Sequence, residues 1–157
     1  MRLQARLRAV ADAIPAGASV VDIGSGDGQL SVWLAGSGRC RRVVASELRS
    51  GPFERAQERL QGSGVELRLG DGFTVLKAGE VEVAVLAGMG GRRMLRLIES
   101  AAGLARTLRL LVLQPMQQRQ EVRAGLESLG FAVVDERRAI QRGRQYTLLL
   151  AVPVASG

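Results

Sequence analysis

The feature that most constrains this chain is a run of three glycines between an apolar segment and a helical pattern. Residues 20–30 read Val-Val-Asp-Ile-Gly-Ser-Gly-Asp-Gly-Gln-Leu. The β-branched residues predict a buried strand over 19–23, and the glycines predict a tight turn before a helix that begins at Gln29. Glycine adopts positive φ without steric cost and lets the backbone approach a ligand closely. In open α/β sheets such a turn lies at the carboxyl ends of the strands, where nucleotide-like ligands bind.

The spacing of these glycines argues against a dinucleotide as the ligand. The turn reads Gly-Ser-Gly-Asp-Gly, whereas dinucleotide-binding enzymes use G-x-G-x-x-G. Asp27 would also place a negative charge beside the helix N-terminus, where a pyrophosphate should lie. S-adenosylmethionine has no phosphate and carries a cationic sulfonium and an ammonium group. We therefore expect S-adenosylmethionine as the cofactor.

The rest of the chain alternates short apolar strands with helices. Further strands are expected over 43–46, 65–69, 81–86, 108–113, 131–135 and 146–152, and helices over 3–14, 29–34, 52–60, 93–102 and 118–129. Such alternation predicts a parallel sheet covered by helices. The last two strands, joined by an Arg-rich connector, predict a hairpin. The predicted fold class is α/β: a Rossmann-like class I methyltransferase arrangement with a seven-stranded, mostly parallel sheet, an antiparallel last strand and helices on both faces.

Composition limits the remaining possibilities. The 157 residues suffice for a single domain over 1–157, and no apolar run reaches the ~18 residues of a membrane span. The N-terminus has no apolar signal region, so a cytoplasmic protein is expected. With no histidine and one cysteine, no protein-held metal is expected. The net charge of +7 favours nucleic acid as a partner, while only 3% aromatic residues argues against a surface that stacks many bases.

The candidate ligand residues all lie at the carboxyl ends of predicted strands, the edge where this architecture binds ligands. Asp22 lies in the first strand, and Glu47 ends the second, where a carboxylate can accept hydrogen bonds from both ribose hydroxyls. Asp71 follows the third and could accept from the amine of an adenine, although Gly-Asp-Gly is also a common turn. The expected cofactor-binding residues are Asp22, Gly24, Ser25, Gly26, Glu47, Leu48, Asp71, Gly72, Ala87 and Gly88.

With these residues in view, the chain resembles the bacterial TrmK family, S-adenosylmethionine-dependent methyltransferases that act on N1 of adenosine 22 in tRNA. The matching stretches are Arg6-Leu7, Val10-Ala11, Ile14-Pro15, Asp22–Ser25, Glu47, Gly51–Phe53, Gly70–Gly72, Ala87–Gly91 and Leu113–Pro115. Where family members commonly read Asp-His-Ala-Tyr, this chain has Gly26-Asp27-Gly28-Gln29. Family members also carry a C-terminal helical domain, which we expect this chain to lack. The resemblance implies tRNA as the partner.

Methyl transfer to adenine N1 needs alignment more than deprotonation, because N1 already offers a lone pair. The product base is cationic, so a nearby carboxylate or carbonyl would stabilise it. Asp27 is the expected acid, and Met89 and Gln114 are expected to shape the catalytic pocket. Two alternatives remain open: a non-catalytic RNA-binding domain with a methyltransferase fold, and a small-molecule methyltransferase.

Arginines in two segments are expected to contact RNA, because both segments should emerge at the cofactor edge of the sheet. These residues are Arg92, Arg93, Arg137, Arg138, Arg142 and Arg144. Arg39, Arg41 and Arg42 precede the second strand and are expected in a solvated loop at the opposite edge.

Overall fold

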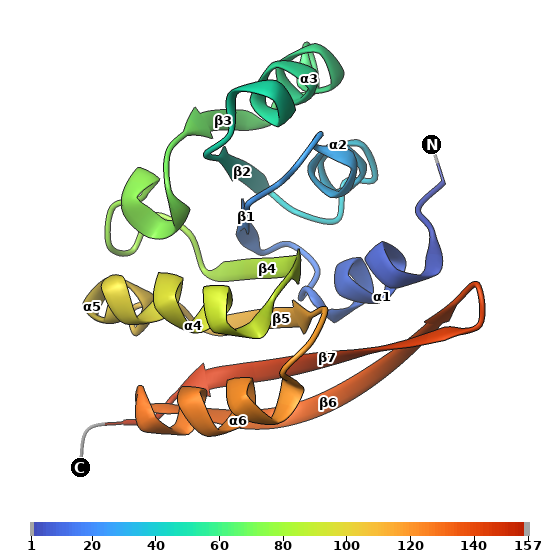
Figure 1. The fold of residues 1–157 in the computed structure, drawn as a ribbon. Coiled ribbons are helices and arrows are strands. Elements are labelled where there is room, and N and C mark those ends of the chain that lie inside the picture. The colour runs from blue at the N-terminus through green and yellow to red at the C-terminus, as the bar shows by residue number, and fades with distance from the viewer. Residues whose placement is uncertain (1, 156–157) are drawn as a thin grey trace.

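A computed structural model of the chain describes residues 2–155 and contains a seven-stranded sheet (Figure 1). The strands are β1 (Ser19–Ile23), β2 (Arg42–Glu47), β3 (Glu66–Leu69), β4 (Val83–Met89), β5 (Leu110–Pro115), β6 (Phe131–Gln141) and β7 (Arg144–Pro153). Their order is β3-β2-β1-β4-β5-β7-β6, and among the described strands β7 alone runs in the opposite direction to the others. The predicted α/β fold class is confirmed.

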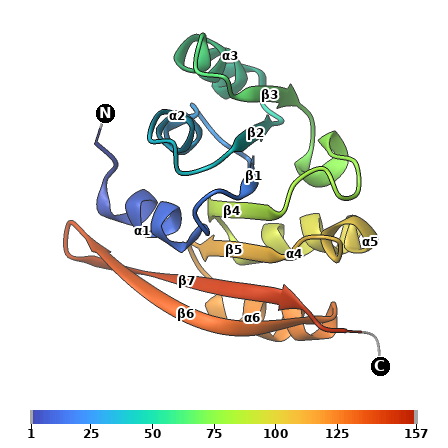
Figure 2. The same cartoon turned by 180° about the vertical axis from the view of Figure 1, so that it is seen from behind.

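Helices cover both faces of the sheet, as Figures 1 and 2 show from opposite sides. They are α1 (Ala5–Ala13), α2 (Gln29–Gly36), α3 (Ser50–Leu60), α4 (Gly91–Ser100), α5 (Ala102–Ala105), α6 (Arg119–Ser128) and a short 3₁₀ helix, η1 (Gly72–Val75). Along β4 the side chains alternate between faces: Val85 packs in one core with residues of α1 and α2, and Leu86 packs in another with residues of α4 and α6. Because both faces are buried, the central strands read as continuous apolar runs.

The C-terminal hairpin differs most from the sequence prediction. The expected Arg-rich loop is absent from the described structure: β6 and β7 continue through it, and only Arg142 and Gly143 lie between them. Both have positive φ, at 51° and 75°, as a two-residue hairpin turn requires. Arg137 and Arg138 therefore lie on a strand. β6 is an edge strand with largely exposed side chains, so it accommodates charges that a central strand would not.

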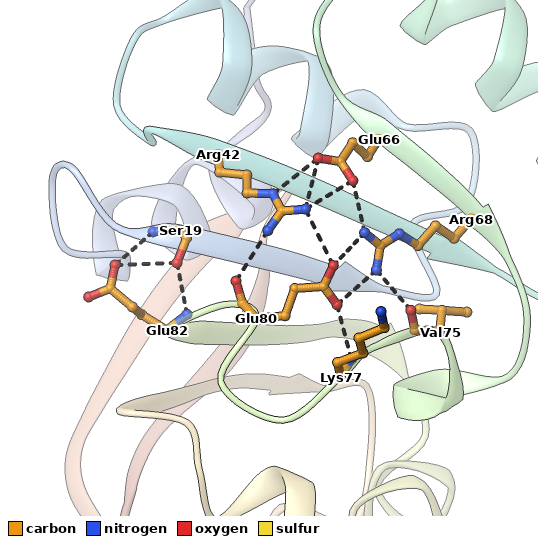
Figure 3. Close-up of polar contacts among 8 residues, drawn as sticks. All are labelled: Ser19, Arg42, Glu66, Arg68, Val75, Lys77, Glu80 and Glu82. Carbon is orange, nitrogen blue, oxygen red and sulfur yellow. Dashed lines mark hydrogen bonds and ion pairs between the residues drawn. The ribbon is translucent and has the colours of Figure 1, made fainter.

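The end of the sheet opposite the glycine turn, where β2 and β3 begin, carries a network of arginine and glutamate side chains (Figure 3). Arg42 of β2 lies 2.9 Å from Glu66 and 3.3 Å from Glu80, and Arg68 of β3 contacts both carboxylates. Hydrogen bonds from Arg68 and the Lys77 backbone hold the pKa of Glu80 near 2. This network ties together β2, β3 and the segment that leads into β4.

The arginines expected at that edge are found there, but they are not free in solvent. Arg39 donates to the Ile14 carbonyl at 2.7 Å, and Arg41 forms an ion pair with Glu82 at 2.9 Å. The expectation of a solvated loop over Arg39–Arg42 is therefore wrong, because its side chains hold neighbouring segments together. None of the helices within residues 2–155 is long and apolar enough to cross a membrane.

Candidate active site

Two adjoining cavities lie where β1, β2 and β4 end. The first, of about 380 Å³, is lined by residues of the glycine turn, α1 and the β6–β7 hairpin, and the second, of about 430 Å³, extends over Glu47 and Met89. Gly24, Arg49, Ala87 and Gly88 line both cavities. The two spaces therefore form one elongated site across the sheet edge, and we call it the joined cavity.

The glycine turn forms the floor of the first cavity. Gly24, Gly26 and Gly28 have φ of 65°, 60° and 84°, so all three adopt the conformation that the sequence predicts. The Ser25 N–H donates to the Ser46 carbonyl at 2.8 Å, which fixes the turn across the end of β2. The Ser25 hydroxyl oxygen is buried and has no hydrogen-bond partner among the described residues. The turn therefore leaves one polar group available to a ligand.

Asp22 is a buried carboxyl group on the wall of the first cavity. It is 4% exposed, and the Ser31 hydroxyl donates to its Oδ2 at 2.9 Å. Burial raises the pKa of Asp22 to about 7, and the negative charge of Glu47 raises it further, while Ser31 and Arg6 oppose the shift. The carboxyl group therefore titrates near neutral pH until a cation approaches it.

Glu47 is the corresponding carboxylate of the second cavity. It is 4% exposed and accepts a hydrogen bond from the Leu48 N–H at 2.9 Å through Oε2. Arg49 lies 3.6 Å from Oε1, but its side chain is 74% exposed. Among residues 2–155, the exposed Arg49 side chain is the one charged partner of Oε1, so Glu47 can accept hydrogen bonds from a ligand's hydroxyl groups.

Arg6 is a site residue that sequence reasoning did not select. Its Nη1 donates to the side-chain oxygen of Gln114 at 2.7 Å, and the Gly88 N–H donates to the same oxygen at 3.1 Å. The guanidinium approaches Gly88 so closely that a Cβ there would lie 3.1 Å from Nη1. The Arg6-Leu7 match to the TrmK family was the available signal, but spacing could not reveal a contact across 108 residues.

The three expected catalytic residues have different positions. Asp27 lines the first cavity, and its Oδ2 lies 3.3 Å from Arg59 and accepts from Gln29 at 3.2 Å. Met89 lines the second cavity, next to Gly24. Gln114 is fully buried and lines neither cavity, so it reaches the site through Arg6 and the Gly88 backbone.

Two expected cofactor-binding residues lie outside the joined cavity. Asp71 is 55% exposed and lies 3.9 Å from Arg93, which does line the second cavity. Gly72 is buried against Leu97 and begins η1. The other eight expected residues line the joined cavity: Asp22, Gly24, Ser25, Gly26, Glu47, Leu48, Ala87 and Gly88.

The arginines expected to contact RNA divide into two groups. Three of them have carboxylate partners: Arg92 with Glu121 at 3.0 Å, Arg93 with Asp71 and Arg137 with Asp135 at 2.9 Å. The other three lie on the β6–β7 hairpin, Arg138 within β6 and Arg142 and Arg144 at the turn, and form no ion pair with any carboxylate in residues 2–155.

Comparison with known proteins agrees with this geometry. A family profile described as "Methyltransferase domain" matches residues 3–149. The chain belongs to this family. The methyltransferase domain is 32% identical over 155 residues to the tRNA (adenine(22)-N(1))-methyltransferase of Bacillus subtilis, with 96% of this chain and 65% of the relative covered. The chain thus spans less than two thirds of the length of that relative.

Solved structures give the same relationship. The domain matches the crystal structure of B. subtilis TrmK with a TM-score of 0.91 and 31% identity, over 99% of this chain and 68% of that one. A Streptococcus pneumoniae protein solved in complex with S-adenosyl-L-methionine matches with a TM-score of 0.90 and 29% identity, over 97% and 73% of the two chains. The resemblance to the TrmK family is confirmed.

Proposed function

We propose that this methyltransferase domain binds S-adenosylmethionine in the joined cavity and methylates N1 of an adenine in tRNA. The observation that carries the proposal is the distribution of charge along the cavity. Arg6 and Asp22 lie in the first part, and Glu47 lies in the second. A ligand with an amino-acid group at one end and a ribose at the other matches this order of groups.

The polar groups fit S-adenosylmethionine in detail. The Arg6 guanidinium would bind the carboxylate of the amino-acid group, and ionised Asp22 would bind its ammonium. Glu47 would accept hydrogen bonds from the ribose hydroxyls, and the unpartnered Ser25 hydroxyl is a further donor. A Cβ added at Gly26 would meet no heavy atom within 4 Å, so the backbone there is open to the ligand. Asp71 would act only at a distance, through Arg93.

S-adenosylmethionine, when bound, supplies an electrophilic methyl group. The chain has to hold the target adenine with its N1 lone pair aligned, and the absence of histidine is compatible with this task, because no base is required. Asp27 on the cavity wall would stabilise the positive charge of the methylated base. Gln114 would act as a positioning residue, since it fixes both Arg6 and the Gly88 backbone.

Two observations support tRNA as the substrate. The relatives named above include tRNA methyltransferases that match across nearly all of this chain. The chain also carries a net charge of +7, and Arg138, Arg142 and Arg144 of its hairpin form no ion pair with a carboxylate among the described residues. Phosphates of RNA attract such charges. The cytoplasmic location expected from the sequence stays a prediction.

A non-catalytic RNA-binding domain is the second candidate function. It is favoured by the altered residues 26–29 and by the ion pair of Asp27 with Arg59. Two experiments distinguish the enzyme from the RNA-binding domain. The first is titration calorimetry with S-adenosylmethionine, and the second is methyl transfer from labelled cofactor into bulk tRNA, followed by nucleoside analysis. Binding with formation of 1-methyladenosine supports the enzyme. No binding at millimolar cofactor supports the second candidate, and binding without transfer to any RNA favours a small-molecule substrate.

A further inference from the structure

The β6–β7 hairpin extends past the sheet at the edge that holds the joined cavity. β5 pairs with β7 only from Leu111↔Ala151 to Leu113↔Leu149, whereas β6 and β7 remain paired as far as Gln141↔Arg144. The tip of the hairpin therefore lies beyond the carboxyl end of β5, next to α1 (Figure 1). Any large substrate that reaches the cavity from this side meets the hairpin.

Hydrogen bonds fix the hairpin tip to the wall of the cavity. Gln141 accepts from the Arg6 N–H at 2.9 Å and donates to the Gln4 side chain at 2.7 Å. Gln4, Arg6 and Gln141 all line the first cavity. The tip is thus part of the site and holds a set position relative to Arg6.

Arg144, next to the hairpin turn, makes two contacts that set the position of its side chain. Its guanidinium carbon lies 5.1 Å from the centroid of the Tyr146 ring, and its Nη2 donates to the Met116 carbonyl at 3.4 Å. The Met116 N–H in turn donates to the Met89 carbonyl at 2.9 Å. Arg144 is therefore placed between the single tyrosine of the chain and Met116, which is itself bonded to Met89.

This arrangement leaves Arg144 able to bind a nucleotide. Its side chain is exposed and forms no ion pair with a carboxylate in residues 2–155, so its charge remains available. A guanidinium with one face against an aromatic ring presents its other face and its free N–H groups to solvent. RNA-binding proteins use such planes to stack unpaired bases and to bind phosphates. Arg92, Arg93 and Arg137 lack this freedom because carboxylates contact them.

We propose that Arg144 holds an unpaired nucleotide next to the target adenine, and that Tyr146 is a positioning residue that acts through Arg144. The inference rests on the proposed function, because it assigns to the hairpin the RNA that the joined cavity would methylate. Of the six arginines expected to contact RNA, Arg138, Arg142 and Arg144 then form a docking element on the hairpin. The other three, Arg92, Arg93 and Arg137, are paired with carboxylates.

The test measures steady-state methylation of tRNA by the full-length wild-type chain and by its R144K, Y146L and Y146F variants. R144K keeps the positive charge but loses the planar guanidinium. Y146L keeps Arg144 but removes the aromatic ring that the guanidinium packs against. Both should raise KM for tRNA about 3–10-fold, with kcat and the S-adenosylmethionine Kd unchanged. Y146F should restore the low KM. R123K is the matched control. Arg123 of α6 pairs with Glu136 of β6, away from the joined cavity.

Unchanged KM in both R144K and Y146L, in a preparation that methylates tRNA, overturns the inference. A second result would also overturn it: Y146L changes both the Tm and the cofactor Kd, and Y146F has a raised KM like Y146L. That pattern would indicate that Tyr146 has a structural role only. If the wild-type chain methylates no RNA, the proposed function fails, and fluorescence anisotropy of a labelled tRNA tests the hairpin alone. Weaker binding by R144K than by R123K then supports the docking element, and equal binding overturns it.

Discussion

The guanidinium of Arg6 donates a hydrogen bond to the buried side-chain oxygen of Gln114 at 2.7 Å. The Gly88 N–H donates to the same oxygen, so one acceptor fixes a charged side chain and a backbone segment on the cavity wall. Burial lowers the pKa of Arg6, although an arginine remains protonated at neutral pH.

We predict that Gln114→Met destabilises the fold and weakens cofactor binding. The methionine has a similar volume but leaves the Arg6 guanidinium and the Gly88 N–H without this acceptor, and losing the two hydrogen bonds costs about 1–3 kcal/mol in all. Urea denaturation should report that loss, and calorimetry should report S-adenosylmethionine binding about 3–10-fold weaker. Gln120→Met, at an exposed position on α6, is the control. Wild-type affinity in the Gln114 variant would exclude a positioning role.

Glu47→Ala should weaken S-adenosylmethionine binding at least tenfold. The carboxylate would accept two charge-assisted hydrogen bonds from the ribose, and losing them costs at most about 1.5–3 kcal/mol each. Calorimetry measures the effect, with Glu54→Ala on the exposed face of α3 as the control. An affinity equal to that of the wild type would remove Glu47 from the cofactor site.

Asp22 should make folding stability and cofactor affinity change in opposite directions with pH. Its pKa is about 7 in the folded chain and 3.8 as an isolated group, so between these values the folded state retains a proton that the unfolded state has released. Stability should therefore fall as pH rises from about 4 to about 7. Binding of an ammonium group to the ionised carboxylate should instead strengthen through pH 7.

The Asp22→Asn variant distinguishes the pH dependence caused by Asp22 from that caused by other carboxylates. The pKa values of Glu80 and Glu82 are lowered to about 2, so their contributions change only in more acidic solution. Denaturation and calorimetry at pH 5 and pH 8 should both show weaker pH dependence in the variant. A variant with the wild-type pH dependence in both measurements would show that Asp22 does not control either.

Gly24→Val should abolish cofactor binding. The residue has a φ of 65°, which a β-branched side chain resists, and its Cβ would also meet the Met89 methyl group at 3.1 Å. Gly38→Val is a matched control, because Gly38 has a φ of 72° and open space around it. Both variants should lose stability, as circular dichroism melting would show, but only Gly38→Val should still bind. Binding by a folded Gly24→Val variant would mean that the turn does not contact the ligand.

The sequence was sufficient to place the core of the fold and most of the cofactor residues. β1 occupies the predicted range, and the carboxyl ends of β1, β2 and β4 bring Asp22, Glu47 and Gly88 to one edge. These inferences succeed because buried parallel strands are continuous apolar runs and because parallel strands end at the same edge.

The long hairpin and the Arg6 contact were not predictable in this way. Residues 136–141 carry charges that disfavour a buried strand, and only their pairing with β7 makes them a strand. Arg6 and Gln114 meet because α1 packs over the end of the sheet, and no local pattern encodes a contact over that separation. Gln114 was expected at the pocket, and its full burial follows from its position in the central strand β5.

The most direct test of this account is methyl transfer from labelled S-adenosylmethionine to a tRNA transcript that has adenosine at position 22, compared with one that has guanosine there. We predict 1-methyladenosine at a single position in the first transcript, no product in the second, and a strongly reduced rate with Glu47→Ala. Cofactor binding with no methylated adenosine in any tRNA would contradict it.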